Sequence, residues 1–417
     1  MAAQPHPACP VHEHFDPLAA EFLADPYAVM AALPLEETPV FYAPAIDGYV
    51  VTRYADVEAV FLDPETYSAA AAQMPLVPLV PEAAEILLAG GHRPQPSMVS
   101  IDPPAHGRLR RPTSRAFTPR RVTEMEPRVR AILAELLDAV DPSAPFDLVR
   151  ALTFPLPATV IFSFMGVPRE DYAQLEEWCG HRATLAWGRP APDEQVEHAT
   201  SMAAYRRYLR DLVAAKATDR ADDFTSALLA IRDEDPDALA QEEIASILFS
   251  LSFAGHETTN YLIGNMLRRL LEAPARWDAV VADPTTIPVV VEETLRHDTS
   301  VPFWRRRTKR ATTVGGVDVP EGATLFLWLA AAGHDPAVFD EPDRFDATRP
   351  NAKRHLAFGK GIHFCIGSAL GKLEAQLALE ELTRRFPRLR LVEDHPPLRF
   401  HPNISFRGPL ELWVRAG

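Results

Sequence analysis

Cysteine is scarce in this chain: its 417 residues include only Cys9, Cys179 and Cys365, which lie far apart. An odd and sparse set excludes a disulfide framework, so each thiol has to be considered by itself. Long apolar runs are missing as well, since no uninterrupted stretch approaches the ~20 residues that cross a bilayer. No basic segment followed by an apolar one opens the chain. The sequence therefore predicts a cytoplasmic protein with no membrane partner.

Positive charge is in deficit, because 42 Lys and Arg residues face 57 Asp and Glu residues and give a net charge of −15. Such a charge disfavours nucleic acid as a partner. Signatures of electron-carrying cofactors are absent too: there is no Gly-x-Gly-x-x-Gly after a strand, no flavin site and no iron–sulfur cysteine spacing. The chain is therefore not expected to draw electrons from a nicotinamide cofactor by itself.

Glycine is sparse beside proline, with 19 residues against 40. Prolines at this density stop helices often. Most segments between them have helical periodicity, and strand-like runs are few and short. The clearest helical segments are 126–140, 152–165, 170–187, 203–217 and 366–386, and the strand-like runs are 48–52, 324–329 and 410–414. The pattern predicts a mainly α protein with a minor sheet, and without a linker one large domain is expected.

One expected helix, 241–272, stands apart because it contains no proline and ends before Pro274. At 1.5 Å per residue it is roughly 45–50 Å long. Its middle, 244–253, is apolar nearly all round, as in a helix buried on every side. The sequence Ala254-Gly255-His256-Glu257-Thr258-Thr259 then places polar groups and a glycine at the centre, which is costly in a buried helix. A functional site is the usual reason for such a cost.

The strongest signal is Phe358-Gly359-Lys360-Gly361-Ile362-His363-Phe364-Cys365-Ile366-Gly367. A glycine loop delivers the cysteine to the start of a helix, whose N–H groups and positive dipole end favour a thiolate. Three interpretations are open: a buried structural cysteine, a Cys/His nucleophile that uses His363, and a thiolate ligand of haem, which favours O–O cleavage. Small residues around the sulfur allow a flat ligand to approach the backbone, which favours haem.

This stretch resembles the haem-binding loop of the cytochrome P450 family, with Phe, Gly, Gly, Cys and Gly at the family's intervals. The resemblance implies one large, mainly helical domain over 1–417, with small β-sheets and a long central helix over haem b. It places a β-containing part at about 1–70, a helical core at about 101–300 and the haem loop at 351–372. Cys365 would be the axial iron ligand, and the loop residues beside the haem would be Phe358, Gly359, Gly361 and Gly367.

The centre of the long helix is similar to the family's acid–alcohol motif. Thr258 would hold dioxygen and water, Glu257 would link them to solvent, and Ala254 with Gly255 would leave space, because the reaction needs protons in a mostly dry pocket. The structural alternative is that the Thr258 hydroxyl bonds back to a carbonyl one turn earlier. A metalloprotease His-Glu-x-x-His motif is excluded, since Asn260 stands where the second histidine would be.

Further motifs follow the family's order. His106 and Arg110 would reach one haem propionate, and Arg306 and His363 the other, although Arg305 and Arg307 are alternatives to Arg306. Glu293 and Arg296 share a helix face, and the resemblance implies that Arg344 joins them in a buried lock behind the cysteine loop. One segment departs from the family pattern, with Ala332-Gly333-His334-Asp335 where Ala-Asn-Arg-Asp is frequent.

The resemblance predicts a monooxygenase that inserts one atom of O2 into a small organic substrate. Candidate pocket residues are mostly apolar and favour a hydrophobic or aromatic substrate over a charged one. They are Met98, Ser250, Phe253, Pro302, Trp304, Asn403 and Ile404. Trp304 could equally be a core residue. Electrons would come from a separate ferredoxin and ferredoxin reductase, docking at Arg108, Arg111, Arg354, Lys360 and Lys372. The alternatives are a peroxide-driven peroxygenase and a non-catalytic haem sensor.

Overall fold

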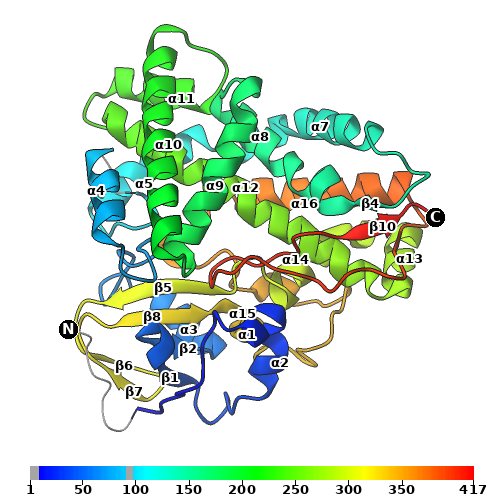
Figure 1. The fold of residues 1–417 in the computed structure, drawn as a ribbon, viewed down its shortest axis with the longest axis horizontal. Coiled ribbons are helices and arrows are strands. Elements are labelled where there is room, and N and C mark those ends of the chain that lie inside the picture. Colours follow the sequence, from blue (N-terminus) through cyan, green and yellow to red (C-terminus); the bar gives the residue numbers. More distant parts are fainter. Residues whose placement is uncertain (1–8, 91–96) are drawn as a thin grey trace. The chain divides into compact units, whose positions relative to one another are not determined.

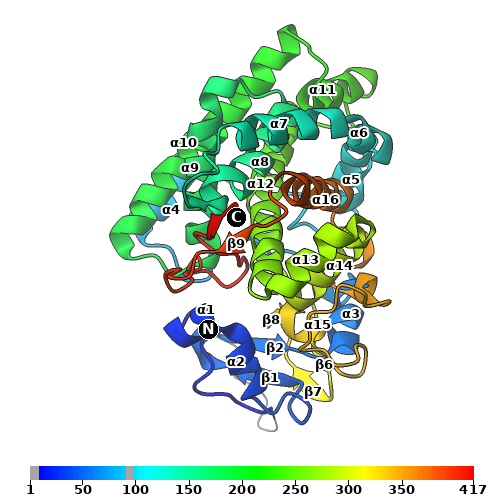
Figure 2. The same ribbon diagram turned by 90° about the vertical axis from the view of Figure 1, so that its right-hand side faces the viewer.

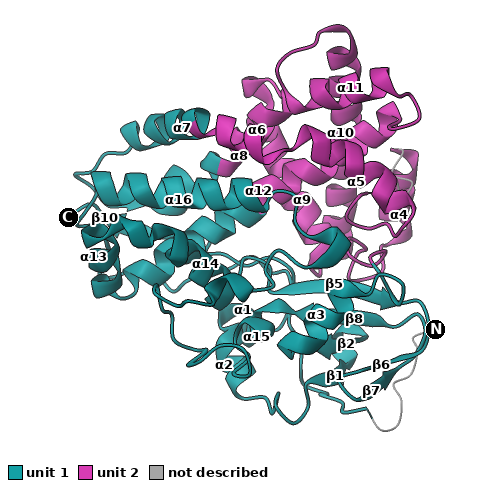
Figure 3. Cartoon of the chain, turned by 180° about the vertical axis from the view of Figure 1, so that it is seen from behind, with its two compact units in different colours: residues 1–68, 127–156, 258–417 teal, residues 69–126, 157–257 magenta. Residues whose placement is uncertain are grey.

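The computed structural model describes residues 9–90 and 97–417. Its contacts divide the chain into two compact units, coloured separately in Figure 3. Unit 1 comprises Met1–Ser68, Pro127–Leu156 and Thr258–Gly417, and unit 2 comprises Ala69–Glu126 and Pro157–Glu257. The described strands all belong to unit 1, whereas unit 2 is helical.

The principal sheet of unit 1 has five strands in the order β1-β2-β8-β5-β3. Only the β2–β8 pair is parallel, with Tyr49 opposite Leu325. The strands are rich in β-branched and aromatic residues, which suits a pleated surface, and β2 and β8 are almost entirely buried. In chain order the sheet comprises β1 (Val40–Ala43), β2 (Gly48–Val51), β3 (Tyr67–Ser68), β5 (Phe303–Thr308) and β8 (Thr324–Trp328). Figure 1 shows β5 and β8 side by side.

Two smaller sheets complete the strand content of unit 1. Their members are β4 (Phe146–Asp147), β10 (Trp413–Arg415) and β9 (Arg390–Leu391) in one sheet, and β6 (Thr312–Val314) and β7 (Val317–Val319) in the other.

Among the helices of unit 1, α14 packs against α16 and α15, and α15 packs against α3 (Figures 1 and 2). The helices of unit 1 are α1 (Ala20–Ala24), α2 (Pro26–Ala31), α3 (Tyr54–Leu62), α7 (Glu126–Asp138), α13 (Pro274–Ala282), α14 (Ile287–His297), α15 (Leu329–Gly333) and α16 (Ser368–Arg385). In unit 2, α10 packs against both α4 and α9. The helices of unit 2 are α4 (Pro81–Ala89), α5 (Ala105–Ala116), α6 (Pro119–Glu124), α8 (Pro155–Met165), α9 (Tyr172–Trp187), α10 (Pro192–Thr218) and α11 (Phe224–Glu234).

The predicted long helix is α12, which runs from Gln241 to Leu271 and passes from unit 2 into unit 1 at position 258. Glu242 and Glu243 occupy its first turn, and Arg268 and Arg269 occupy its last. The charges at both ends therefore interact favourably with the helix dipole. Its predicted bounds are confirmed to within one residue.

The mainly helical fold with small sheets is confirmed. The helices and strands predicted individually are present with errors at their ends, whereas strands such as β1 and β6 were not predicted. Helix α10 begins at Pro192, eleven residues before the predicted start, because proline is tolerated in a first helical turn. The last strand begins only at Trp413, since the preceding residues 410–412 run outside the ladder.

Candidate active site

Cys365 lies on a tight loop that leads into α16. Its backbone N–H donates to the carbonyl of Phe358 at 2.9 Å, which closes the loop. Gly359 and Gly361 both have φ +66°, the left-handed conformation that favours glycine. A side chain on Gly361 would also meet the carbonyl oxygen of Phe61 at 2.8 Å. Both glycines are thus required by the backbone, as the sequence pattern predicted.

The Cys365 side chain is half-buried, whereas Cys9 and Cys179 are buried. Burial raises the pKa of Cys9, and it raises the pKa of Cys179 to about 12. Both of these thiols are therefore kept protonated. Cys365 instead precedes α16 by three residues, where the helix N-terminus favours a thiolate.

Helix α12 has an open strip in an otherwise buried surface. From Glu243 to Arg268 every residue is buried except Leu251, Ala254, Gly255 and Thr258. These four positions are spaced i, i+3, i+4 and i+7, so they lie on one helix face. The strip coincides with the predicted acid–alcohol motif and leaves room for a ligand against that face.

Gly255 has a packing role that the sequence did not reveal. A Cβ on this residue would lie 2.6 Å from Cγ1 of Ile161 on α8. Its missing side chain therefore permits the close approach of two helices, and the space it would leave beside dioxygen stays a prediction.

Glu257 is buried, with 3% exposure, and His256 beside it is fully buried. The His256 ring is adjacent, with its Nδ1 3.9 Å from Glu257 Oε1. Burial raises the pKa of the half-buried Glu176 on α9, and the charge of Glu257 raises it further. Unit 2 therefore places a second carboxyl group near the predicted proton-delivering acid.

In unit 1, α16 packs against α12 directly after Thr258. A Cβ on Gly371 would lie 3.4 Å from the Thr259 hydroxyl, so the glycine permits this close packing. Asn260, one residue further along α12, accepts a hydrogen bond from Thr153 at 2.8 Å. The helix that begins beside Cys365 is thus fixed against the helix that carries Thr258.

The predicted lock behind the cysteine loop contains one wrong member. Glu293 and Arg296 are fully buried and paired at 2.7 Å. The third partner is Arg349, whose Nε lies 3.1 Å from Glu293 Oε2. The side chain of Arg344 is instead 60% exposed and pairs with Glu341 at 2.9 Å. Only the carbonyl of Arg344 belongs to the lock, where it accepts from Arg296 and Arg349.

The propionate candidates of unit 2 share one face of α5. His106 is buried and Arg110 half-buried. Burial lowers the pKa of His106, and the neighbouring charge of Arg110 lowers it further, so the two groups are close.

In unit 1, the alternation of β5 separates the three arginines considered for the other propionate. Arg306 shares its face with Trp304, and its guanidinium carbon lies 5.1 Å from the ring centre of Phe61. Arg305 points to the opposite face, and burial lowers its pKa to about 10. Arg307 is exposed and donates to the Gly322 carbonyl. His363 is half-buried in the cysteine loop.

Among the pocket candidates of unit 2, Ser250 shares a hydrogen bond of 2.7 Å with Ser97. Phe253 is stacked on Trp187, with ring centres 5.2 Å apart. Met98 is buried. Trp187 belongs to the stretch 178–190 that the resemblance placed in the pocket roof, but it was not named individually, and its neighbour in the stack is 66 positions away.

The pocket candidates of unit 1 have mainly structural contacts. Trp304 packs against the hydrophobic core, as its alternative interpretation proposed. The Asn403 side chain accepts from the N–H groups of Ser405 and Phe406, so it stabilises a turn. Pro302 and Ile404 are buried.

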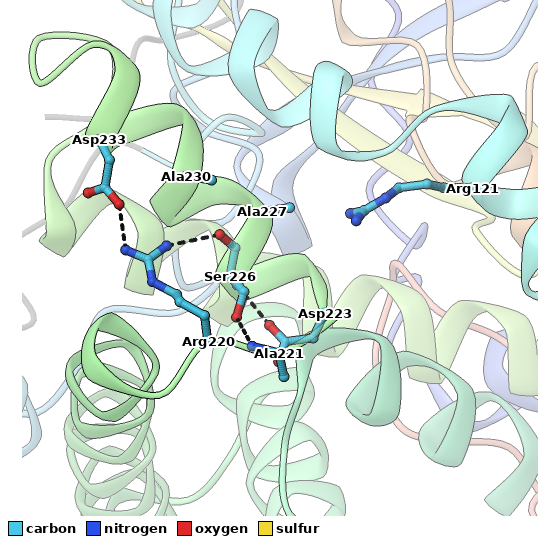
Figure 4. Close-up of a pocket in the computed structure, with 8 residues that line it drawn as sticks. All are labelled: Arg121, Arg220, Ala221, Asp223, Ser226, Ala227, Ala230 and Asp233. Carbon is cyan, nitrogen blue, oxygen red and sulfur yellow. Dashed lines mark hydrogen bonds and ion pairs between the residues drawn. The ribbon is translucent and has the colours of Figure 1, made fainter.

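A hollow on unit 2 is lined by residues of α6, α11 and the segment before α11 (Figure 4). Arg220 pairs with Asp233 at 2.7 Å and donates to the Ser226 carbonyl. Asp223 caps α11 and pairs with Lys216 at 2.6 Å. These charges compensate one another, so the hollow is held together by its own residues.

Comparison with known proteins identifies the class of protein that combines this fold and this loop. The family model for cytochrome P450 matches residues 195–410. The chain is 38% identical over 370 residues to erythromycin C-12 hydroxylase of Saccharopolyspora erythraea, covering 88% of the chain and 89% of the relative. It is 37% identical over 410 residues to vitamin D(3) 25-hydroxylase of Pseudonocardia autotrophica, covering 97% of each.

Among solved structures, cytochrome P450 CREJ in complex with (4-ethylphenyl) dihydrogen phosphate superposes with a TM-score of 0.91 at 36% identity, covering 97% of this chain and 99% of that one. The chain belongs to the cytochrome P450 family. It is a monooxygenase that binds haem b and uses O2 to oxidise small organic substrates. In the described residues no helix is long and apolar enough to cross a membrane.

The residues present fit haem. The open strip on α12 leaves a flat ligand room, and the cysteine loop keeps a sulfur accessible at a helix N-terminus. Buried or half-buried cations in each unit suit carboxylates such as the propionates.

Proposed function

We propose that Cys365 is the axial thiolate ligand of the haem in this monooxygenase. The observation that carries the proposal is its accessible sulfur before the N-terminus of α16, on a loop shaped by two left-handed glycines. Haem, when bound, supplies the activation of dioxygen and the transfer of one oxygen atom. As its ligand, the Cys365 thiolate would donate electron density to the metal, which favours O–O cleavage. Small residues beside the sulfur support this role, since a Cβ on Gly367 would lie 3.9 Å from Cys365 Sγ.

Thr258 and Glu257 would deliver protons at the open strip of α12. The half-buried Thr258 hydroxyl can hold a water molecule, and the buried Glu257 carboxylate can pass a proton along the helix. The charge of Glu257 raises the pKa of Glu176, and Glu176 is only half-buried. Glu176 would therefore extend this proton path toward solvent. His106 with Arg110, and Arg306 with His363, would hold the two propionates through charge-assisted hydrogen bonds.

A carbonyl-adduct spectrum tests the thiolate assignment. Holoenzyme with Cys365→Ser should lose the thiolate-type spectrum and resemble a haem protein without a sulfur ligand. Cys9→Ala removes a buried thiol whose pKa is raised, and should leave the spectrum unchanged. A thiolate-type spectrum in the Cys365→Ser protein would contradict the proposal.

We also propose that a separate ferredoxin and its reductase supply electrons, in the cytoplasm, to a single haem domain. Three of the five cations expected to dock the ferredoxin are already neutralised by acids of the same chain. Arg108 pairs with Glu243, Lys372 with Glu292 at 3.1 Å, and Lys360 with Glu58 at 3.5 Å. Arg354 and Arg111 are exposed, and neither forms such a pair with the residues that the structure describes. Arg354 lies next to the cysteine loop in sequence and is the strongest docking candidate.

Electron transfer from an acidic ferredoxin should slow with rising ionic strength, because charge attraction guides the encounter. Arg354→Glu should slow reduction, whereas Arg388→Glu, at another exposed arginine, should have little effect. Equal rates for both variants would remove Arg354 from the docking surface.

A further inference from the structure

Two buried arginines flank one aromatic ring in unit 2. Arg182 on α9 is 4% exposed and Arg206 on α10 is 8% exposed. Their guanidinium carbons lie 4.1 Å and 4.9 Å from the ring centre of Phe249 on α12. Arg182 also lies 5.1 Å from the ring of Phe253, one helical turn further on.

Neither guanidinium has an acidic partner in the described part of the chain. Arg182 donates to the Phe249 carbonyl, a neutral group. The acid whose charge raises the pKa of Arg206 is Glu242, but Glu242 pairs with Arg210 at 2.8 Å. Burial lowers the pKa of both arginines to about 10, so each remains charged at neutral pH.

This arrangement departs from what buried charges normally require. A buried charge is ordinarily paired, because removing it from water is costly. Here two like charges lie close enough for the charge of Arg206 to lower the pKa of Arg182. Elsewhere in unit 2, Arg108 pairs with Glu243 and Arg220 with Asp233. The two arginines beside Phe249 therefore have no compensating negative charge among the described residues. A bound anionic ligand can supply that charge.

The surroundings are those expected of an organic ligand. Trp187 is stacked on Phe253, and Tyr205 lies 5.2 Å from Phe249 between ring centres. Ser250 and Ser97, hydrogen-bonded to each other, follow on the same helix and the preceding loop. Two of these residues, Ser250 and Phe253, are pocket candidates from the sequence. Aromatic surfaces suit an apolar body, and a guanidinium suits a planar or tetrahedral anion.

We propose that Arg182 and Arg206 form an anion subsite for the substrate, which is a hydrophobic acid with a carboxylate or phosphate group. The inference rests on the monooxygenase function and refines it, since the sequence favoured an uncharged substrate. Arg182 would donate to the anion with N–H groups other than the Nη1 that donates to the Phe249 carbonyl, and Arg206 contributes a second positive charge on the other helix. The aromatic residues hold the apolar body, and the anion fixes its orientation.

Matched pairs of acids and neutral analogues test the subsite in the holoenzyme. The probes are decanoate with methyl decanoate, 4-ethylbenzoate with its methyl ester, and 4-butylphenyl phosphate with 4-butylphenol. Binding is measured by the spectral shift of the haem and independently by calorimetry. At least one acid should bind about tenfold or more tightly than its neutral partner, as expected for a charge-assisted hydrogen bond. The carboxylate and phosphate arms distinguish the two anions.

Variants assign the effect to the arginines. Arg182→Gln and, separately, Arg206→Gln should weaken the preferred acid about tenfold or more and leave its neutral partner within about twofold. Arg207→Gln removes an exposed charge from the same turn of α10 and should change neither. If one glutamine variant does not fold, the other provides the test, because each arginine is proposed to contact the anion.

The proposal is overturned if no acid binds more tightly than its neutral partner, or if the glutamine variants weaken both members of a pair equally. Each variant should retain the thiolate-type carbonyl spectrum. Loss of that spectrum in the parent protein would instead refute the haem-thiolate assignment, so the two failures are distinguishable.

Discussion

The buried carboxylate of Glu293 depends on two arginines that come from very different positions in the sequence. Arg296 follows it by three residues on α14, and the pair could be predicted from helix spacing. Arg349 reaches it from an irregular segment 56 positions away. Nothing in the local sequence distinguishes Arg349 from Arg344, because their difference arises only when the segment folds over α14.

Replacing Arg349 with Ala should lower the free energy of unfolding by about 3–5 kcal/mol, since it leaves the Glu293 charge buried without one partner. Arg344→Ala removes an exposed side chain and should change it by about 0.5 kcal/mol or less. Denaturant unfolding of the two variants measures the difference. Similar losses for both would show that the lock does not depend on the Arg349 side chain.

Thr258→Ala should lower the product formed per electron pair by about tenfold or more, because the hydroxyl that holds the proton-donating water is lost. Electron consumption should continue and end in peroxide. The measurement is the ratio of product to reductant consumed, with Thr258→Ser as the control that keeps a hydroxyl. An unchanged ratio would favour a peroxide-driven enzyme, and an unchanged biological response without any turnover would favour a sensor.

At the scale of elements, periodicity and proline breaks were sufficient to predict the long helix. The bounds of α12 follow from the absence of proline between 241 and 271 and from charges that suit each end. Exposure of one strip could not be predicted, since it depends on which neighbours leave that face open. The same limit applies to Gly255, whose packing partner Ile161 is distant in sequence.

Gly255→Ala offers a test in which local and tertiary effects have opposite signs. Alanine should favour an isolated helix by about 1 kcal/mol. The added methyl group, however, would lie 2.6 Å from Ile161, and overpacking costs about 1–3 kcal/mol. We expect a net loss of stability by thermal unfolding.

The double variant Gly255→Ala with Ile161→Ala provides the control, because the smaller residue makes room for the new methyl group. It should be more stable than the sum of the single effects by about 1 kcal/mol or more. Additive effects, or a stabilised Gly255→Ala protein, would contradict the packing explanation.

At the scale of the molecule, the sequence predicted the fold class, the family and the cofactor, because these depend on short motifs with strict local geometry. It did not predict the anion subsite. Arg182, Arg206 and Phe249 come from three helices, and only their packing shows that the two charges are buried without an acidic partner among the described residues. Charge compensation is a property of the folded chain, so composition and spacing could not reveal it.

The departure from the family pattern at His334 has a consequence for acid stability. His334 Nε2 donates to the His297 carbonyl at 2.9 Å, and its Nδ1 lies 2.8 Å from Oδ1 of Asp343. The exposed Asp343 favours the charged ring, but burial is the larger effect and lowers the pKa of His334. Burial, with the neighbouring His334 and Arg269, lowers the pKa of His297 to about 2.

Both histidines are therefore neutral in the folded protein at a pH where the unfolded chain, with a histidine pKa of about 6.5, takes up protons. The unfolded state then binds more protons, so stability is complete above about pH 6.5 and falls as the pH decreases, by up to about 1.4 kcal/mol per pH unit for each histidine. His334→Gln should reduce the loss of Tm between pH 7.5 and pH 5. His14→Gln, at an exposed histidine, should leave that loss unchanged. An equal loss of Tm in His334→Gln and the parent protein would show that His334 already carries a proton in the folded state.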